Sequence, residues 1–218
     1  MDQTRGWFFT LHAIASMLFD SVAFKNIISN GLVLDKNGNK MSKRLGNGVD
    51  PLRLMEDYGA DGMRFGLLMQ VTGAQDLKFN EAKLESSRNF AIKIRNAARF
   101  VMMNLEGFTP GEPQPATLAD RWMFSRLAAL VAKLDEAYET YDFGAITREL
   151  YAFFWNEFCD WYIELSKARL QAGGEDALVC QRNLVFVLDT ALRLLHPIMP
   201  FVTEQIYQEL PGLSLIHI

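Results

Sequence analysis

The sequence predicts a mainly α-helical protein in which a short α/β segment precedes a bundle of helices. The β-branched runs that favour strands are confined to the first fifty residues. From residue 80 onward, apolar residues recur at spacings of three and four, the pattern of helices with one buried face. Three prolines stand between residues 110 and 115. Because proline cannot donate a helical hydrogen bond, this stretch is expected to be a linker within the helical part.

The composition is that of an ordinary globular protein. Half of the 218 residues are hydrophobic, and the formal net charge is -4. This charge excludes a protein that coats nucleic acid non-specifically, since such binding needs a concentrated basic face. No apolar run is long enough to span a bilayer and no basic-then-apolar leader precedes one, so we expect a cytoplasmic protein with no membrane partner. Cys159 and Cys180 are expected to be reduced core residues.

The first elements are predicted to be a helix and two strands. Trp7–Asp20 has apolar residues at helical spacing, and Val22–Ser29 and Leu32–Asp35 are β-branched or apolar runs. An Asn37-Gly38 pair follows, which is typical of the turn that closes a hairpin. A tight basic turn is therefore expected directly after a strand.

Two short helices are predicted next. Asp50 is a capping acid before Pro51, and Gly59 suits a left-handed C-terminal cap, which together bound the first of them. The second is expected at about Asp61–Val71.

A long helix is predicted from Asn80, its N-cap, to Leu105, with a stop at Gly107. One face of this helix is expected to be apolar, through Phe90, Ile94, Ala97 and Val101. Beyond the linker, the bundle helices are predicted at about Ala119–Glu139, Gly144–Ala168, Ala177–Leu195 and Phe201–Leu210, with breaks at Gly173-Gly174 and Pro197.

The basic turn is the first candidate site. Lys40-Met41-Ser42-Lys43-Arg44 places three cations within five residues, next to glycines. If ATP lay against the preceding strand, the lysines could reach its β- and γ-phosphates and neutralise charge as pyrophosphate leaves. The alternative is a solvated basic hairpin with no ligand, which an isolated cluster of three cations favours.

The run from Asn30 to Asn47 resembles the KMSKS signature region of class I aminoacyl-tRNA synthetases. Arg44 departs from the family's usual serine, although neither lysine is affected. The resemblance implies that Lys43 contacts the ATP phosphates with help from Lys40 and Ser42, and that the backbone at Gly31 and Leu32 lies against adenine. It also implies ATP as substrate, with Mg²⁺ accompanying it.

The opening segment, Asp2 to Phe8, is similar to the part of the isoleucine-specific members that lines the aminoacyl-adenylate. By this resemblance Asp2 and Gln3 would face the adenylate and Trp7 would line the amino-acid pocket. On its own, a tryptophan at a helix start is more often a core residue.

Two parts of the chain resemble two different types of class I synthetase. The first fifty residues look like the isoleucine type, whereas later segments look like the valine type, including Asp57–Asp61, Asn96–Val101, Glu157–Tyr162 and His196–Glu204. Either one sequence mixes the two patterns, or two sequences are joined within the signature region. The length of the match favours the valine type and tRNA for valine as partner, with isoleucine as the alternative.

The resemblance also implies the architecture. Residues 1–79 would be the C-terminal part of a Rossmann-like α/β catalytic domain, residues 80–118 a connecting helix and linker, and residues 119–212 an antiparallel anticodon-binding helical bundle. Residues 213–218 look like a non-native tail. No His-x-Gly-His sequence, the family's other ATP-binding signature, occurs here. We therefore expect a truncated synthetase that is inactive alone, or else a tRNA-binding helical module without catalysis.

Other candidates have competing structural roles. An aromatic cluster, Phe153, Phe154, Trp155, Phe158, Trp161 and Tyr162, could stack on tRNA bases, but its helical spacing favours the bundle core. Four arginines could touch tRNA phosphates or form solvated helix faces: Arg95, Arg99, Arg121 and Arg126. His196 precedes a proline, which favours a capping or core role. No metal site is predicted.

Overall fold

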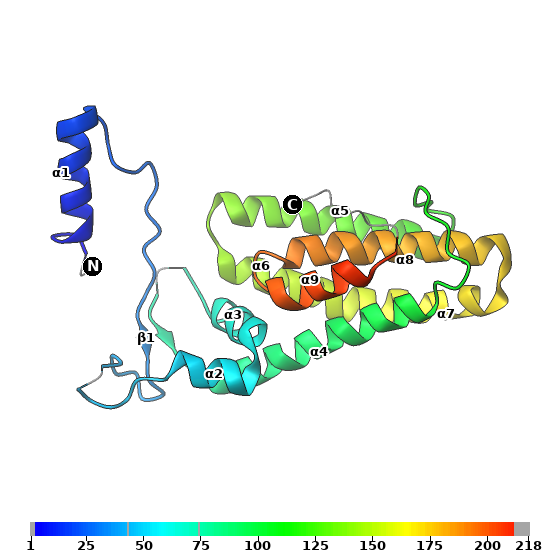
Figure 1. The fold of residues 1–218 in the computed structure, drawn as a ribbon, viewed down its shortest axis with the longest axis horizontal. Coiled ribbons are helices and arrows are strands. Elements are labelled where there is room, and N and C mark those ends of the chain that lie inside the picture. Colours follow the sequence, from blue (N-terminus) through cyan, green and yellow to red (C-terminus); the bar gives the residue numbers. More distant parts are fainter. Residues whose placement is uncertain (1–2, 43, 74, 212–218) are drawn as a thin grey trace.

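The computed structural model describes residues 3–42, 44–73 and 75–211. Asp2, Lys43 and the segment 213–218, which the sequence analysis singles out, lie outside these residues. Figure 1 shows a body of packed helices with a single helix, α1, standing apart from it. The described helices and strands are α1 (Trp7–Phe19), β1 (Val33–Leu34), α2 (Pro51–Tyr58), α3 (Ala60–Leu68), β2 (Leu77–Lys78), α4 (Glu81–Met103), α5 (Leu118–Glu139), α6 (Phe143–Tyr151), the π-helix η1 (Ala152–Tyr162), α7 (Ile163–Ala172), α8 (Gly174–Leu195) and α9 (Pro200–Glu209). The expected mainly helical fold is confirmed, and no helix in the described part of the chain is long and apolar enough to cross a membrane.

The N-terminal helix forms where the sequence predicts it but has no core to join. None of the residues of α1 is buried. The expected strand at 22–29 is wrong, because this segment is irregular and Val22, Ile27 and Ile28 are exposed. A β-branched run becomes a strand only beside a partner, and no described strand pairs with this one.

The sheet of the described residues has two parallel strands. Val33 of β1 lies opposite Leu77 of β2, and Leu34 lies opposite Lys78. An isolated antiparallel bridge joins Leu34 to Lys40, which confirms the tight turn that follows the strand. Gly38 adopts a positive φ of 85° in that turn, as the Asn-Gly pair indicates.

Two short helices connect the sheet region to the bundle. The Asp50 side chain accepts a hydrogen bond from Leu52 N at 3.0 Å, and Pro51 begins α2, both as predicted. Gly59 is the C-cap of α2 and has the expected positive φ, 76°, but its ψ of 154° lies outside the left-handed helical region. Because α3 begins at the next residue, the backbone at Gly59 changes direction from the axis of α2 to that of α3.

The long helix α4 forms one side of the core. The side chain of Asn80 caps it, accepting from Ala82 N at 3.0 Å. Its predicted apolar face is buried: Phe90, Ile94, Ala97 and Val101. The same hydrophobic cluster contains Phe65 of α3 and residues of α5 to α9. One continuous core therefore runs from α3 through α4 into the bundle, across the boundary predicted at residues 79 and 80.

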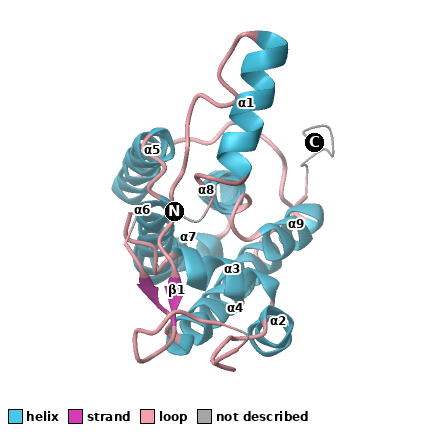
Figure 2. Ribbon diagram, turned by 90° about the vertical axis from the view of Figure 1, so that its left-hand side faces the viewer, coloured by secondary structure: helices cyan, strands magenta, loops and turns pink. Residues whose placement is uncertain are grey.

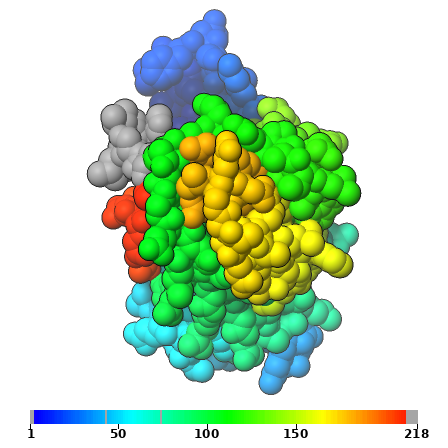
Figure 3. Space-filling view, turned by 90° about the vertical axis from the view of Figure 1, so that its right-hand side faces the viewer, coloured from blue at the N-terminus to red at the C-terminus, as the bar shows by residue number. Residues whose placement is uncertain are grey.

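The proline-containing linker is irregular, as predicted, but it is fixed to α8. Asn183 bonds both backbone groups of Gln114, accepting from its N–H at 2.8 Å and donating to its carbonyl at 2.7 Å. Arg182 donates to the carbonyl of Thr109 at 2.9 Å. Figure 3 shows the green linker region lying against the orange helix α8.

The helix predicted at Gly144–Ala168 is continuous but changes its winding. It begins as α6, runs as the π-helix η1 over Ala152–Tyr162 and ends as α7 at Ala172. A π-helix has more residues per turn than an α-helix, so it rotates the side chains that follow relative to α6. Phe153, Phe154, Phe158 and Tyr162 consequently all face the core.

The aromatic cluster is therefore core, as its spacing favours, with one correction. Trp161 is 61% exposed, whereas its neighbour Tyr162 is fully buried. The π-helical winding places Trp161 on the outer side of the helix. Trp155 is half-buried and lies 5.4 Å from Tyr151, ring centroid to ring centroid, in a stacked arrangement.

A buried polar network joins α5, η1 and α7 within the bundle. The fully buried Asp120 accepts from Tyr162 Oη at 2.7 Å and pairs with Arg169 at 3.0 Å. Burial raises the pKa of the Asp120 carboxyl, but hydrogen bonds from Tyr162 and Thr117 outweigh burial and hold this pKa below its ordinary value. Burial, with the bond to Asp120, raises the pKa of the Tyr162 hydroxyl. Asp120 is thus a charged acceptor held between α5, η1 and α7.

Two side chains of α3 fasten the turn between α8 and α9. The Asp61 carboxylate accepts from Phe201 N at 3.2 Å and from Val202 N at 2.7 Å, which caps α9. Arg64 donates to the carbonyls of Ile198 at 2.8 Å and Pro197 at 3.0 Å. Through these bonds α3, which precedes β2, is attached to the α8–α9 end of the bundle.

Candidate functional site

The basic turn lies at the end of the molecule where the two strands pair, below α1 in the view of Figure 2. The close approach of two backbones leaves room only for glycine at residue 31, because a Cβ there would lie 2.0 Å from the carbonyl oxygen of Gln75. Leu32 donates its N–H to Asp76 Oδ1 at 2.8 Å and accepts from Leu77 N at 2.8 Å. Both main-chain groups of Leu32 are thus occupied, while the residue is 42% exposed.

The turn itself is organised by the Asp35 carboxylate. Its Oδ1 accepts from Asn37 N at 2.9 Å and from Asn39 N at 2.8 Å, and its Oδ2 accepts from Asn47 Nδ2 at 2.9 Å. The bonds from Asn39 and Asn47 lower the pKa of Asp35 below its ordinary value. The carboxylate is therefore ionised at neutral pH and holds both ends of the turn.

The predicted ATP-binding residues lie along this turn. Lys40 pairs with Leu34 across it, and Ser42 donates its N–H to Asn47 Oδ1 at 2.9 Å. Ser42 Oγ also accepts from Leu45 N at 3.2 Å. Gly31, Leu32, Lys40 and Ser42 are thus brought into one region by the sheet and the hairpin, and Lys43 lies outside the described residues.

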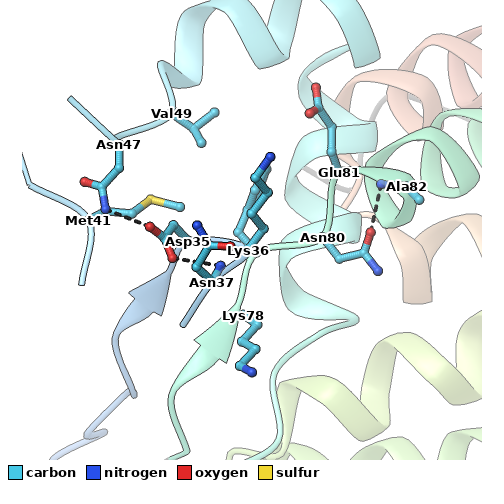
Figure 4. A pocket seen from close by; sticks show the side chains of 11 residues that line it. Asp35, Lys36, Asn37, Met41, Asn47, Val49, Lys78, Asn80, Glu81 and Ala82 are labelled. Atoms are coloured by element: carbon cyan, nitrogen blue, oxygen red, sulfur yellow. Dashed lines mark hydrogen bonds between the residues drawn. The ribbon is translucent and has the colours of Figure 1, made fainter. Parts of the chain in front are cut away.

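A hollow of about 690 Å³ lies between this turn and the start of α4. Figure 4 shows its walls: Asp35, Lys36, Asn37, Met41, Asn47 and Val49 on the turn side, and Lys78, Asn80, Glu81 and Ala82 on the other. Phe79 also lines it. Lys36 and Lys78 bring positive charge and Glu81 brings negative charge. The hollow is open and mixed in charge.

The predicted aminoacyl-adenylate residues lie elsewhere. Gln3 accepts backbone hydrogen bonds from Gly6 at 3.2 Å and Phe8 at 3.1 Å, so it forms the turn that leads into α1. Trp7 is 67% exposed on that helix. Figures 1 and 2 both place α1 away from the basic turn, so the structure does not bring Gln3 and Trp7 beside Lys40.

The four arginines proposed to contact tRNA differ in their present partners. Arg126 makes two hydrogen bonds with Glu157, at 2.8 and 2.7 Å, and these bonds raise its pKa. Arg95 donates to Gln205 Oε1 at 2.9 Å. Arg121 reaches the carbonyl of Ala116 at only 3.5 Å. Arg99 is exposed on α4.

The sequence analysis missed residues that organise the site. Asp35 and Asn47 lie within the signature run without a predicted role of their own, although they make the hydrogen bonds that shape the turn. The Asp-x-Asn-Gly pattern at residues 35–38 was a usable signal, because aspartate commonly bonds the backbone two residues ahead. Asn47 is twelve residues from Asp35, and no local pattern predicts such a contact.

No metal site is evident in the described residues, where no group of three or more histidine, cysteine or acidic side chains could hold an ion. Cys159 and Cys180 are free and buried, as expected. His196 is the C-cap residue of α8, which is one of its two expected roles, and it is exposed and so not a core residue. Its Nδ1 lies 2.9 Å from Thr203 Oγ1 at the turn between α8 and α9.

Comparison with known families accounts for both halves of this arrangement. Residues 1–80 match the model for tRNA synthetases class I (I, L, M and V), and residues 120–218 match the model for the anticodon-binding domain of tRNA ligase. The chain belongs to the class I tRNA synthetases. The basic turn thus lies within the synthetase-matching segment, and the bundle within the anticodon-binding segment.

Curated relatives of this synthetase chain include valine–tRNA ligases. That of Carboxydothermus hydrogenoformans is 49% identical over 209 residues, covering 91% of this chain. That of Thermus thermophilus is 49% identical over 189 residues, covering 87% of this chain. The chain spans 24% and 22% of the lengths of these two relatives.

Solved structures share the fold of the synthetase chain. A LeuRS–tRNA–LeuAMS ternary complex from Agrobacterium radiobacter K84 superposes with a TM-score of 0.70 at 21% identity, covering 92% of this chain and 25% of that one. A methionyl-tRNA synthetase from Mycobacterium tuberculosis, in complex with methionyl-adenylate, gives a TM-score of 0.65 at 24% identity, covering 80% of this chain and 36% of that one. At these identities the likeness concerns the fold alone.

Proposed function

We propose that this chain is the part of a valine–tRNA ligase that carries the ATP-binding signature loop and anticodon-binding helices. The observation that supports this most strongly is the 45–49% identity to valine–tRNA ligases over most of the chain. The isoleucine alternative is not favoured, because the relatives named above are all valine enzymes even though Asp2 to Phe8 look isoleucine-like. A cytoplasmic location remains our expectation.

The proposed chemistry is the activation of valine by ATP. Lys40 and Lys43 would neutralise negative charge on the β- and γ-phosphates while the amino-acid carboxylate attacks the α-phosphate. Ser42 would lie beside them on the same loop. Mg²⁺ would enter as part of the nucleotide substrate.

The adenine of ATP would lie against Gly31 and Leu32. Since both main-chain groups of Leu32 are already hydrogen-bonded, this contact would use the exposed Leu32 side chain and the flat face of Gly31. The absence of a Cβ at Gly31 allows the close approach of the two backbones that lead into β1 and β2. Asp2, Gln3 and Trp7 would complete the adenylate pocket only if α1 packed against the loop.

The helical body would bind tRNA. The formal net charge of the whole chain is -4, so contacts with tRNA phosphates must be local. Arg99 and Arg95 on α4 are better placed for them than Arg126, because Arg126 is paired with the carboxylate of Glu157 and Arg95 only with the neutral Gln205. Arg121 remains a proposed contact at the start of α5. A tRNA-binding module without catalysis is the second candidate function, supported by the continuous core of the body.

Two assays separate these functions. The 218-residue chain should not catalyse valine-dependent ATP–pyrophosphate exchange, because it has no His-x-Gly-His signature to complete the nucleotide site. It should bind tRNA for valine at low salt, and binding should weaken as salt rises, because phosphate contacts release counterions. A normal rate of exchange by the chain would contradict the inference that its nucleotide site is incomplete. Failure to bind tRNA at low salt would contradict the proposal of a tRNA-binding module.

A further inference from the structure

The signature loop contains a side chain whose hydrogen bonds connect three separate parts of it. Asn47 Oδ1 accepts from Ser42 N at 2.9 Å, and Asn47 Nδ2 donates to Asp35 Oδ2 at 2.9 Å and to the carbonyl of Lys40 at 3.3 Å. The amide therefore touches the backbone on both sides of Met41. Figure 4 shows the Asn47 side chain directed toward Asp35 across the turn.

The other end of this connection is fixed independently. The Asp35 carboxylate is bonded to the N–H groups of Asn37 and Asn39, and Asp35 N donates to the carbonyl of Asn39 at 2.9 Å. Asp35 in turn follows β1 directly, so its position is set by the parallel pairing of β1 with β2. Asn47 thereby connects the Lys40–Ser42 backbone to the sheet.

We propose that Asn47, acting through Asp35, is a positioning residue that holds the Lys40–Ser42 backbone in the conformation that receives ATP phosphates. This inference rests on the proposed function. Both halves of the amide are needed, since Oδ1 accepts while Nδ2 donates. Aspartate at this position would keep the acceptor but place a second carboxylate against Asp35. A loop ordered before ATP arrives loses less conformational entropy on binding, which favours catalysis.

The first test follows the loop in the 218-residue chain by limited trypsin digestion. Trypsin cuts after lysine and arginine, and Lys40, Lys43 and Arg44 are consecutive targets within the loop. Asn47→Ala should raise the cleavage rate there by about tenfold, because cleavage tracks local opening. Asn37→Ala is the matched control, since only the backbone N–H of Asn37 bonds to Asp35. Equal rates for the two variants would overturn the proposal.

The second test measures ATP–pyrophosphate exchange in the complete ligase. Asn47→Ala should lower kcat by about tenfold or more while leaving the KM for valine unchanged, since the amide acts on the phosphate-binding loop. Asn47→Asp should be at least as slow. Adding Asp35→Asn to Asn47→Asp restores a donor opposite an acceptor and should recover part of the rate.

The outcomes distinguish this inference from the proposed function. A double variant no faster than Asn47→Asp alone would overturn the pairing, and so would an Asn47→Ala enzyme whose kcat is unchanged. A complete enzyme that shows no valine-dependent exchange at all would instead overturn the proposed function. In that case the trypsin comparison still reports directly on whether Asn47 orders the loop.

Discussion

Inside the bundle Asp120 accepts hydrogen bonds from the Tyr162 hydroxyl and from Thr117, and the guanidinium of Arg169 balances its charge. Replacing Tyr162 by phenylalanine keeps the buried ring but removes one donor. We expect this change to lower the free energy of unfolding by about 1–3 kcal/mol, the cost of leaving a buried polar group short of a partner. Urea denaturation measures the loss.

Tyr151→Phe is the matched control for that variant, because Tyr151 is only half-buried and contributes its ring to the stack with Trp155. It should change the free energy of unfolding little. Equal losses for the two variants would show that the Tyr162 hydroxyl contributes nothing special to stability.

The same carboxylate predicts a pH dependence. The pKa of Asp120 is lower in the folded chain than its usual value of about 3.9. Its contribution to stability is therefore present in full above about pH 4 and is lost as the pH falls through the lowered pKa. The stability advantage of the native chain over Asp120→Asn should shrink below about pH 4, and an advantage that is constant across this range would contradict the prediction.

The roles of individual residues could be predicted from the sequence where they depend on neighbouring residues. Asn80 and Asp50 cap the helices that follow them, because their side chains reach backbone groups two residues ahead. The contact between Asn47 and Asp35 spans twelve residues, and that between Asp61 and Val202 spans 141. Such partners depend on the complete fold and leave no trace in residue spacing.

Among the helices, α3 links the sheet region to the bundle, because its side chains bond to the turn between α8 and α9. Asp61 caps α9 with two hydrogen bonds across this connection. Asp61→Asn keeps one acceptor but removes the charge beside the helix N-terminus. We expect the free energy of unfolding to fall by about 0.5–2 kcal/mol, the usual effect of a lost helix cap.

Thermal or urea unfolding measures this change, with Asp57→Asn as the control. Asp57 is exposed and pairs only at 3.5 Å with Arg53 within α2. The control should therefore be close to neutral. An Asp61 variant as stable as the control would show that the hydrogen bonds from α9 to Asp61 contribute nothing to the free energy of unfolding.

Strands were harder to predict than helices. Helical periodicity located α4 and α5 to within a few residues, but β2 was missed because Leu77–Lys78 has no pattern of its own. Its strand conformation comes from hydrogen bonds to β1, 44 residues earlier. Conversely, 22–29 has strand composition but no partner. The π-helical winding of η1 was also not predicted, because it depends on which aromatic side chains the core can accommodate.

At the scale of the whole molecule, the described residues form a packed body and a separate N-terminal part. None of the residues of α1 is buried, and several large apolar side chains of α1 and 20–32 are exposed. Exposed apolar surface of this kind marks a face that packs against something else.

Removing residues 1–30 should therefore leave the body intact. We expect the midpoint of thermal unfolding to be unchanged and the binding of a hydrophobic dye to fall, since the deleted part contributes exposed apolar surface but no core. Calorimetry and dye fluorescence measure the two effects. A clear drop in the midpoint would mean that α1 stabilises the body through contacts with it.

We propose that the Lys40-containing loop serves valine activation by ATP. The decisive measurement is valine- and isoleucine-dependent ATP–pyrophosphate exchange by the complete enzyme, native and Lys40→Ala. We predict faster exchange with valine than with isoleucine, and a loss of about 100-fold or more in kcat for the variant, because a preorganised charge facing the transition state is removed. Exchange that favours isoleucine, or that is unchanged in Lys40→Ala, would contradict the claim.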